Sequence, residues 1–457
     1  MQERVVIRTE RAGPRMPAAA KDAAYSVAQV ESIARGQGEP GWLADRRREA
    51  LRMYREMPLP VASDEAWRRT DLAGLRLDEL DLNALGVPGR TRRPPADLLK
   101  PLLGKAHGGQ VVFGDFEPAV TPLAPALAAQ GVIFLPFAEA ARTHGDLVQR
   151  YFGEAVNPAE GKFAALVAAV GDVGAFAYVP KGVQAELPLH SVCWTTPSGL
   201  RGWRLLVVVD EGATLTYVHE NASPAGSAAS LRAGVVELIA QKGATLRFVE
   251  FQSWGDNVWN ITHERAQVHE GATLEWIFGG TGSRLTKTFT TLDLLGAGAT
   301  GRMSGFYFAD GQQHLDHDTQ QNHRAPHTTS DLLFKGALKG HSRSVWQGMI
   351  FVARGAEKAD GYQANRNLIL SKNARADSIP GLEILADDVR CTHGATVGQL
   401  DEDEVFYLMT RGIPRPEAER VVVDGFFDTI MQRIPFEGVR RRLRSAIDAK
   451  MGASVRG

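Results

Sequence analysis

The chain has 457 residues, with 52 basic and 53 acidic side chains and a formal net charge of −1. A neutral balance argues against nucleic acid as the main partner, and 23% charged with 44% hydrophobic residues is typical of a globular protein. Two counts stand out, 47 glycines and only two cysteines, Cys193 and Cys391. Two cysteines exclude a disulfide scaffold and any four-cysteine zinc or iron–sulfur site built within this chain.

The first fifteen residues are rich in charged side chains and lack the apolar core of a signal peptide. The most apolar stretch, residues 163–179, is interrupted by Asp172 and two glycines, so it is too broken to span a membrane. We therefore expect a cytoplasmic protein with reduced thiols and no membrane association.

Residues 1–109 predict an N-terminal helical region. Apolar residues recur at helical spacing over residues 25–33 and again over residues 43–57, where Pro58 closes the second helix. The Arg-Arg-Pro-Pro run at 92–95 is typical of a linker. Over residues 110–158 short apolar runs alternate with helical patterns, which predicts a connecting α/β segment.

A short phrase, Gly-Ala-Thr, recurs through the middle of the chain and begins at Gly212, Gly243, Gly271 and Gly298. The spacings are 31, 28 and 27 residues, and runs with strand propensity flank the phrases. Short strands joined by glycine turns at this period indicate stacked coils, so we predict a parallel β-helix core over residues 159–397. Weaker echoes at 355, 373 and 394 predict further turns. An antiparallel sandwich also uses glycine turns, but the near-constant spacing favours the β-helix.

Residues 398–457 predict a C-terminal helical domain. Asp401 and Glu404 form a capping box for its first helix, which Arg411 and Gly412 end. The second helix carries an apolar stripe, and the third has a buried stripe and a basic cluster typical of a solvated or partner-facing surface. The stripe of the second helix is Ala418, Val421, Val422, Phe426 and Ile430; the third buries Val439, Leu443, Ile447 and Met451 and exposes Arg440, Arg441, Arg442 and Arg444.

Cys391 and His393 are the strongest candidates for chemistry. If both lie on one strand, they point to the same face, so the thiol and the imidazole could share a ligand or a proton. Arg390 and a protonated His393 would favour the thiolate. The alternative is that Cys391 is a small buried hydrophobe and His393 a hydrogen-bonded turn residue.

Four of the twelve histidines lie between residues 314 and 327. Alternation along a strand would separate His317 from His314, Asp316 and Asp318, which fits polar ladders between coils better than a metal site. A polysaccharide-active β-helix enzyme would need paired carboxylates, and no spacing pairs the available ones. These are Asp316, Asp318, Asp387 and Asp388. The chain also lacks the phosphate-binding loop of ATPases.

A long and specific signature covers the last hundred residues. It consists of residues 363–371, 376–377 and 380–384, the run Ala-Asp-Asp-Val-Arg-Cys-Thr-His-Gly-Ala-Thr at 386–396, and residues 406–408 and 411–413. This signature strongly resembles the SufB/SufD family of iron–sulfur cluster assembly proteins. Residues 39–43 and 65–71 resemble the N-terminal helical region of SufD-type chains.

The resemblance implies a right-handed parallel β-helix between two helical regions. It also implies a SufB–SufD heterodimer joined through the β-helices, with the ATPase SufC bound to the C-terminal helices. Such a chain would be a non-catalytic scaffold subunit, with ATP hydrolysis carried out by SufC. A transient iron–sulfur cluster would form at the partner interface, and no cofactor would be bound by this chain alone. His393 would lie there beside Cys391 and could hold iron together with the partner chain.

Between the two siblings the sequence favours SufD, because SufB chains usually carry additional cysteines. The expected SufC-docking residues are Phe406, Tyr407, Arg411, Val422 and Phe426. The isolated chain could form homodimers through the surface meant for SufB. A SufB-like subunit, a polysaccharide lyase or hydrolase and a structural β-helix module are the alternatives.

Overall fold

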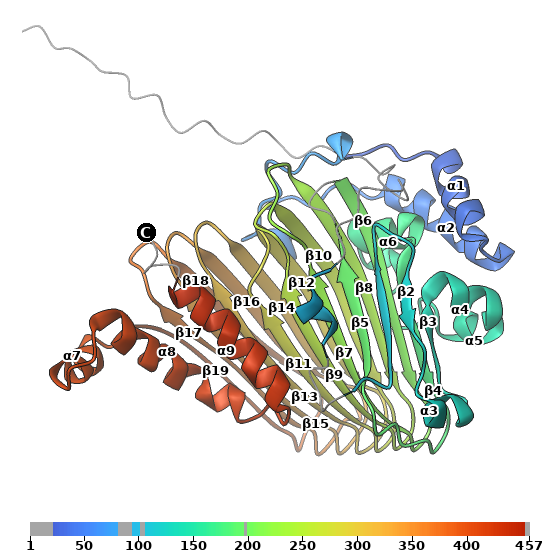
Figure 1. Cartoon of the computed structure of the whole chain (residues 1–457). Coiled ribbons are helices and arrows are strands. Elements are labelled where there is room, and N and C mark those ends of the chain that lie inside the picture. Colours follow the sequence, from blue (N-terminus) through green and yellow to red (C-terminus); the bar gives the residue numbers. More distant parts are fainter. Residues whose placement is uncertain (1–21, 81–93, 101–105, 196–198, 453–457) are drawn as a thin grey trace, which may run out of the picture.

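The core of the molecule is a stack of coils, each of which contributes one strand to each of two facing sheets (Figure 1). The computed structural model describes residues 22–80, 94–100, 106–195 and 199–452. From β4 to β19 the strands alternate between the sheets, and strands two apart in the chain pair in parallel. The chain is therefore a parallel β-solenoid of about eight turns with helices at both ends, which confirms the β-helix prediction.

The ten-stranded sheet contains β2 (Ala119–Thr121), β1 (Gly109–Gly114), β5 (Leu189–Trp194), β7 (Thr214–Ala222), β9 (Thr245–Ser253), β11 (Thr273–Gly280), β13 (Thr300–Ala309), β15 (Thr329–Leu338), β17 (Asp360–Ile369) and β19 (Arg390–Gln399). The nine-stranded sheet contains β3 (Ile133–Pro136), β4 (Val173–Val179), β6 (Gly199–Val209), β8 (Ser230–Ala240), β10 (Val258–Val268), β12 (Leu285–Leu294), β14 (His314–His323), β16 (Arg343–Val352) and β18 (Arg375–Ile384). At the first end of the solenoid, β2 and β3 pair antiparallel with β1 and β4.

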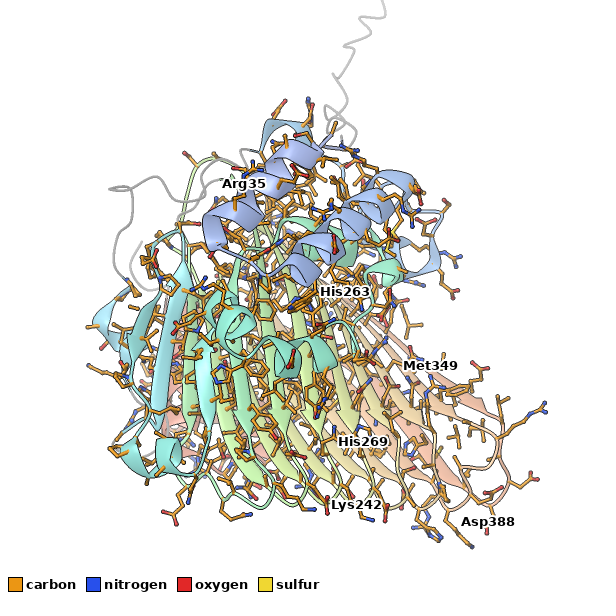
Figure 2. All side chains as sticks on the ribbon, turned by 90° about the vertical axis from the view of Figure 1, so that its right-hand side faces the viewer. Arg35, Lys242, His263, His269, Met349 and Asp388 are labelled. Atoms are coloured by element: carbon orange, nitrogen blue, oxygen red, sulfur yellow. The ribbon has the colours of Figure 1, made fainter. Side chains whose placement is uncertain are left out.

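The recurring Gly-Ala-Thr phrase forms turns between successive strands. Its four glycines have φ between 64° and 72°, a left-handed conformation that only glycine adopts without strain. The amide of Gly243 donates to Glu270 O (2.8 Å) in the next coil, so the turns stack along one edge. Lys242 and Asp388 mark positions along this edge in Figure 2. The echo at 394 is different, since Gly394 lies inside β19 and forms no turn.

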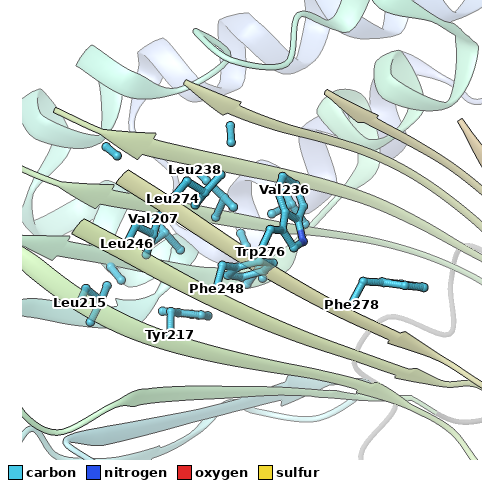
Figure 3. Close-up of a cluster of buried hydrophobic side chains, with 14 of the residues drawn as sticks. Val207, Leu215, Tyr217, Val236, Leu238, Leu246, Phe248, Leu274, Trp276 and Phe278 are labelled. Atoms are coloured by element: carbon cyan, nitrogen blue, oxygen red, sulfur yellow. The ribbon is translucent and has the colours of Figure 1, made fainter. Parts of the chain in front are cut away.

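The lumen of the solenoid is apolar near these turns and polar farther along the strands. Leucines, valines and aromatic rings from both sheets fill the apolar half, as Figure 3 shows for Val236 and Leu238 of β8 and Phe248 of β9. Burying each such side chain contributes about 1.5–3 kcal/mol. The polar half holds fully buried side chains such as Glu250, Glu264 and His317, so the interior is built to accommodate hydrogen-bonding groups.

The N-terminal helices cover the outer face of the nine-stranded sheet (Figure 1). α1 (Val27–Gln37) begins at a Ser26 capping box and α2 (Gly41–Glu56) ends before Pro58, as predicted. The remaining helices of this part are α3 (Pro125–Ala129), α4 (Phe137–Thr143), α5 (Gly145–Tyr151) and α6 (Lys162–Val170), with 3₁₀ turns at Glu65–Trp67, Leu77–Glu79, Ala96–Leu99 and Pro158–Glu160. Part of the predicted linker at 92–95 lies outside the described residues.

Three C-terminal helices follow the last strand: α7 (Glu402–Thr410), α8 (Arg415–Met431) and α9 (Glu437–Gly452). The Asp401 carboxylate accepts from two amides of the first turn, and Gly412 follows the end of α7 with φ 87°. α9 lies across the outer face of the ten-stranded sheet and buries the four residues predicted for it. No helix in the described ranges is long and apolar enough to cross a membrane.

The predicted apolar stripe of α8 is right at its two ends, Ala418 and Ile430, and wrong between them. The helix buries Ala418, Val423, Phe427 and Ile430, whereas Val421 is 42% exposed. Adjacent apolar residues at 421–423 and 426–427 fit either phase of the helix. Packing against the sheet decides between them, because the Phe427 ring meets Phe306 of β13 edge-on with the ring centroids 5.7 Å apart.

Candidate functional site

The last coil of the solenoid leaves both sheets open. β18 and β19 are the outermost strands of their sheets, at the end of the array farthest from α1 to α5 (Figure 1). Two side chains that face the lumen side on these strands, Ile384 and Val397, are 40% and 49% exposed. They alternate along the strands with the outward side chains. A free strand edge next to exposed apolar side chains is the kind of surface on which another sheet can pair.

Cys391 and His393 lie on β19 at this open end. In the parallel register with β17, Cys391 is opposite Gly361 and His393 is opposite Gln363. Residues two apart on a strand share a face, so both side chains point to the lumen side, as the sequence predicts. The alternative in which His393 belongs to a turn is wrong. Cys391 is half-buried and His393 is exposed, so the imidazole is accessible to a partner.

His323 is a third side chain at this place, and no local pattern in the sequence links it with Cys391. Its Nε2 atom and Cys391 Sγ lie 3.2 Å and 3.3 Å from the point that a Cβ atom on Gly361 would occupy. His323 is fixed by Thr328 Oγ1 (2.7 Å) and Ser330 Oγ (2.8 Å). Burial lowers the pKa of His323 to about 4, so it is a neutral imidazole near the thiol.

The thiol of Cys391 is not activated toward the thiolate. Burial raises its pKa, the nearby carboxylate of Asp360 adds to the increase, and a backbone hydrogen bond from Gly361 opposes it. The prediction that Arg390 favours the thiolate is therefore wrong. Neighbouring strand residues point to opposite faces, and the Arg390 guanidinium lies 3.8 Å from Asp360 in a highly exposed position.

A network of amides fills the lumen just behind the last coil. Asn367 Nδ2 donates to Asn365 Oδ1 (2.6 Å), Ser378 Oγ donates to the same oxygen (2.6 Å), and Tyr307 Oη donates to Asn367 Oδ1 (2.6 Å). Next to them, the Oε1 atom of Gln363 is buried without a hydrogen-bond partner. Polar residues at alternate positions of 363–367 are the sequence signal for this network, since alternation places them on one face.

The predicted SufC-docking residues divide into two groups. Phe406 and Tyr407 of α7 are 66% and 58% exposed, and the Arg411 guanidinium lies 5.1 Å above the Tyr407 ring. Val422 and Phe426 of α8 are half-buried. The Phe426 ring packs on Phe427, with ring centroids 5.1 Å apart, and under the ammonium group of Lys335.

The histidine-rich strand β14 has its side chains on two faces, as alternation predicts. His317 lies in the lumen, where Thr288 Oγ1 is 3.0 Å from its Nδ1 atom. His314 and Asp316 lie outside, beneath Thr70, whose hydroxyl hydrogen-bonds to both. Lys287, fully buried, pairs with Asp316 (3.0 Å). The carboxylate of Asp316 is thus engaged in holding the N-terminal segment.

Comparison with known proteins places this architecture in a family. The family model described as "SUF system FeS cluster assembly, SufBD core domain" matches residues 196–426, and the one described as "SufBD protein N-terminal region" matches residues 105–190. An iron–sulfur cluster assembly SufBD family protein of Staphylococcus epidermidis is 32% identical over 432 residues, covering 89% of each chain. The iron–sulfur cluster assembly protein SufB of Bacillus subtilis is 31% identical over 432 residues, again covering 89% of each chain. The chain therefore belongs to the SufBD family of the SUF system for iron–sulfur cluster assembly.

Proposed function

We propose that this chain is a SufD-like, non-catalytic scaffold subunit of a SufB–SufC–SufD complex. Clusters would assemble at the interface with SufB, driven by ATP hydrolysis in SufC. The observation that carries the proposal is the open last coil, where Cys391 and His393 share the lumen face of an edge strand. The iron–sulfur cluster is the cargo of this site rather than a resident cofactor.

The SufB partner would dock on the last coil. The free edges of β18 and β19 present unpaired backbone groups to a second solenoid, and exposed apolar side chains such as Ile384 and Val397 would be buried by it. A partner of the same architecture would extend both sheets across the junction. The same surface would allow the isolated chain to pair with a second copy of itself.

His393 would hold iron together with groups from SufB. An exposed imidazole is a good ligand for ferrous iron. Among the residues that the structure describes, no three side chains of His, Cys, Asp or Glu are grouped so that they could hold a metal ion, so the remaining ligands would come from the partner. Iron or a cluster bound beside Cys391 would lower the pKa of its thiol, because a coordinated thiol loses its proton.

SufC would dock on α7 and the adjoining face of α8. Phe406 and Tyr407 offer exposed aromatic rings, with Arg411 beside them, and Val421, Val422 and Phe426 extend the apolar surface along α8. An amphipathic helix in a groove is a common recognition mode. Because β19 ends at Gln399 and α7 begins at Glu402, a movement of α7 would act directly on the strand that carries His393.

The proposal that the chain is SufD-like rests on its small number of accessible thiols. Cys193 is fully buried in the lumen and burial strongly raises its pKa, which leaves Cys391 as the one accessible thiol of the two. A chain that accepts sulfur would need more accessible thiols. The second candidate is a SufB-like subunit, which the likeness to the Bacillus subtilis SufB supports.

The test is co-expression with SufB and SufC from the same organism. We expect the three chains to co-purify, and His393→Ala to leave the complex intact while activity of a cluster-dependent enzyme in cells falls. Thr392→Ala is the matched control, since Thr392 is exposed on the same strand but points to the opposite face.

The outcomes distinguish the scaffold role, the role of His393 and the SufB-like alternative from one another. Failure to co-purify with SufB and SufC would contradict the scaffold role. Full cluster assembly with His393→Ala would remove His393 from the mechanism. A chain that takes up sulfur on Cys391 and supports assembly with SufC in the absence of SufB would be SufB-like.

A further inference from the structure

A cavity of about 280 Å³ opens between the N-terminal segment and the outer face of the nine-stranded sheet, far in sequence from Cys391 and His393. Its walls carry four arginines: Arg68 and Arg69 follow the Glu65–Trp67 turn, Arg284 precedes β12, and Arg343 begins β16. Among the lining residues the one carboxylate is Asp71, and it accepts a hydrogen bond from the amide of Ala73 (2.8 Å). The cavity is therefore strongly basic in a chain of neutral net charge.

The floor of the cavity is a column of stacked residues. Trp259, Leu285, His314 and Arg343 occupy equivalent positions of four successive coils. Adjacent parallel strands are about 4.8 Å apart, so the column runs from an apolar end at Trp259 to a cationic end at Arg343. A ligand on this floor would meet an indole and an aliphatic side chain on one side and guanidinium groups on the other.

Three of the four guanidinium groups are uncommitted. Within the described ranges, Arg68, Arg69 and Arg284 form no ion pair and no side-chain hydrogen bond, whereas Arg343 binds Asp377 (2.8 Å). The Nε atom of Arg343 is nevertheless buried without a hydrogen-bond partner. A buried donor without an acceptor costs free energy, and an anion in the cavity would be a suitable acceptor.

The backbone before Arg284 is held in an unusual conformation. Ser283 has φ 78°, a left-handed value that strains a residue with a side chain. Gln313 Nε2 donates to Ser283 O (2.7 Å), and the hydroxyls of Ser283 and Thr286 are 2.7 Å apart. These contacts fix the start of β12 and so the direction in which Arg284 leaves it.

The charges around His314 are mainly positive, with Asp377 as the opposing carboxylate. After burial, the largest causes that lower the pKa of His314 to about 4 are the charges of Arg343 and Lys287. His314 is thus neutral at pH 7, with one ring nitrogen 2.8 Å from the Thr70 hydroxyl.

We propose that this cavity is a binding site for a phosphate-type anion, held by Arg69, Arg284 and Arg343 against the Trp259–His314 floor. Guanidinium groups bind phosphate oxygens in pairs of parallel hydrogen bonds, which makes arginine the preferred residue for such ligands. A volume of about 280 Å³ accommodates a pyrophosphate or a small phosphorylated compound. The site is separate from the surfaces of the proposed function, and it stands or falls independently of them.

The experiment is isothermal titration calorimetry on the full chain at low salt, with inorganic phosphate, pyrophosphate and ADP as separate probes. We expect saturable 1:1 binding of at least one probe. Arg69→Gln and Arg284→Gln should each weaken it at least tenfold, and 0.5 M NaCl should weaken it further because salt screens exposed charges. Tighter binding of ADP than of pyrophosphate would show that the ligand has an organic part lying against Trp259.

Arg354→Gln is the control, since Arg354 is an exposed arginine in the turn before β17 and its replacement removes the same charge. Circular dichroism of each variant verifies folding, which neither Arg69 nor Arg284 should affect because they make no side-chain hydrogen bond in the described structure. The proposal is overturned if no probe binds with a Kd below about 1 mM (about −4 kcal/mol). It is equally overturned if Arg354→Gln weakens binding as much as Arg284→Gln does.

Discussion

Cys391 stands directly opposite Gly361 in the parallel register between β19 and β17, and its Sγ atom would lie 3.3 Å from a Cβ atom at that glycine. His323 Nε2 and Ile350 Cγ2 each lie 3.2 Å from the same point. The missing side chain of Gly361 therefore provides the space in which the thiol and the imidazole face each other.

Gly361→Ala should destabilise the protein by about 1 kcal/mol, because the methyl group meets three side chains at less than ordinary contact distance. His323 cannot move away easily, since two hydroxyls hold it. Urea denaturation measures the change in the free energy of unfolding. Gly394→Ala on the neighbouring strand is the matched control, because nothing lies within 4 Å of its added Cβ. Equal stability of the two variants would contradict the packing described for Gly361.

The two cysteines should differ sharply in reactivity. Cys193 is fully buried and Cys391 half-buried, so the native protein should react with one equivalent of a thiol reagent and the denatured protein with two. Because the pKa of Cys391 is raised by burial and then by Asp360, its alkylation rate should still be increasing above pH 9. Asp360→Asn should shift that pH profile downward, since it removes a negative charge that disfavours the thiolate. A Cys391 profile with a midpoint near pH 7 would contradict this environment.

The fold was predictable from the sequence where one residue type determines the backbone conformation of the turns. Glycine at the positive φ of each turn gives the repeat its visible phrase through Gly298. At the equivalent stacking positions of the later turns His327, Lys358 and Asp388 have positive φ, so the phrase fades although the coils continue. The phase of α8 was not predictable, because Val422 and Val423 are equally apolar and only the sheet beneath them distinguishes the two.

The site was predictable within one strand and not between strands. Alternation alone places Cys391 and His393 on one face. The approach of His323 depends on the stacking of β14, β17 and β19, which belong to different sheets, and no local pattern encodes that register. Likewise the charge effect expected from Arg390 failed because a neighbouring residue in sequence points to the opposite face of the strand.

Two partly buried ion pairs join α9 to the solenoid, Lys450 with Asp310 (2.6 Å) and Arg442 with Glu220, and the second can be tested without disturbing the first. Glu220 on β7 lies 2.6 Å from an Arg442 guanidinium nitrogen and 3.2 Å from His190 Nε2. Glu220→Gln should lower the free energy of unfolding by about 1–2 kcal/mol, because it leaves the Arg442 and His190 side chains without their acid. Amide hydrogen exchange should increase in α9 more than in α6. Glu437→Gln is the control, since its pair with Arg440 is exposed and such pairs contribute about 0–1 kcal/mol.

The buried carboxylate of Glu264, which interacts with that of buried Glu250, should contribute to the pH dependence of stability. Burial raises its pKa from 4.5 to about 7, although the Thr290 and Thr262 hydroxyls, each 3.0 Å away, oppose the shift. Between these two values the folded protein binds more protons at Glu264 than the unfolded chain does, so this contribution to stability falls as pH rises through that window. Glu264→Gln should therefore raise the free energy of unfolding at pH 8 by about 1–3 kcal/mol relative to wild type, and have little effect at pH 4.5.

Burial lowers the pKa of histidines such as His219 and His317 to about 3. Below pH 6.5 their contribution to stability therefore increases as pH rises, which is opposite to the effect of Glu264. The measured quantity must therefore be the difference between Glu264→Gln and wild type, by urea denaturation at each pH, because the histidine contribution is common to both and cancels. Glu160→Gln is the control, since Glu160 pairs with Arg265 in a partly exposed position (2.8 Å). A Glu264→Gln variant that is less stable than wild type at pH 8 would mean that its carboxylate is ionised and stabilised in the lumen. The polar half of the solenoid would then accommodate a buried negative charge instead of excluding it.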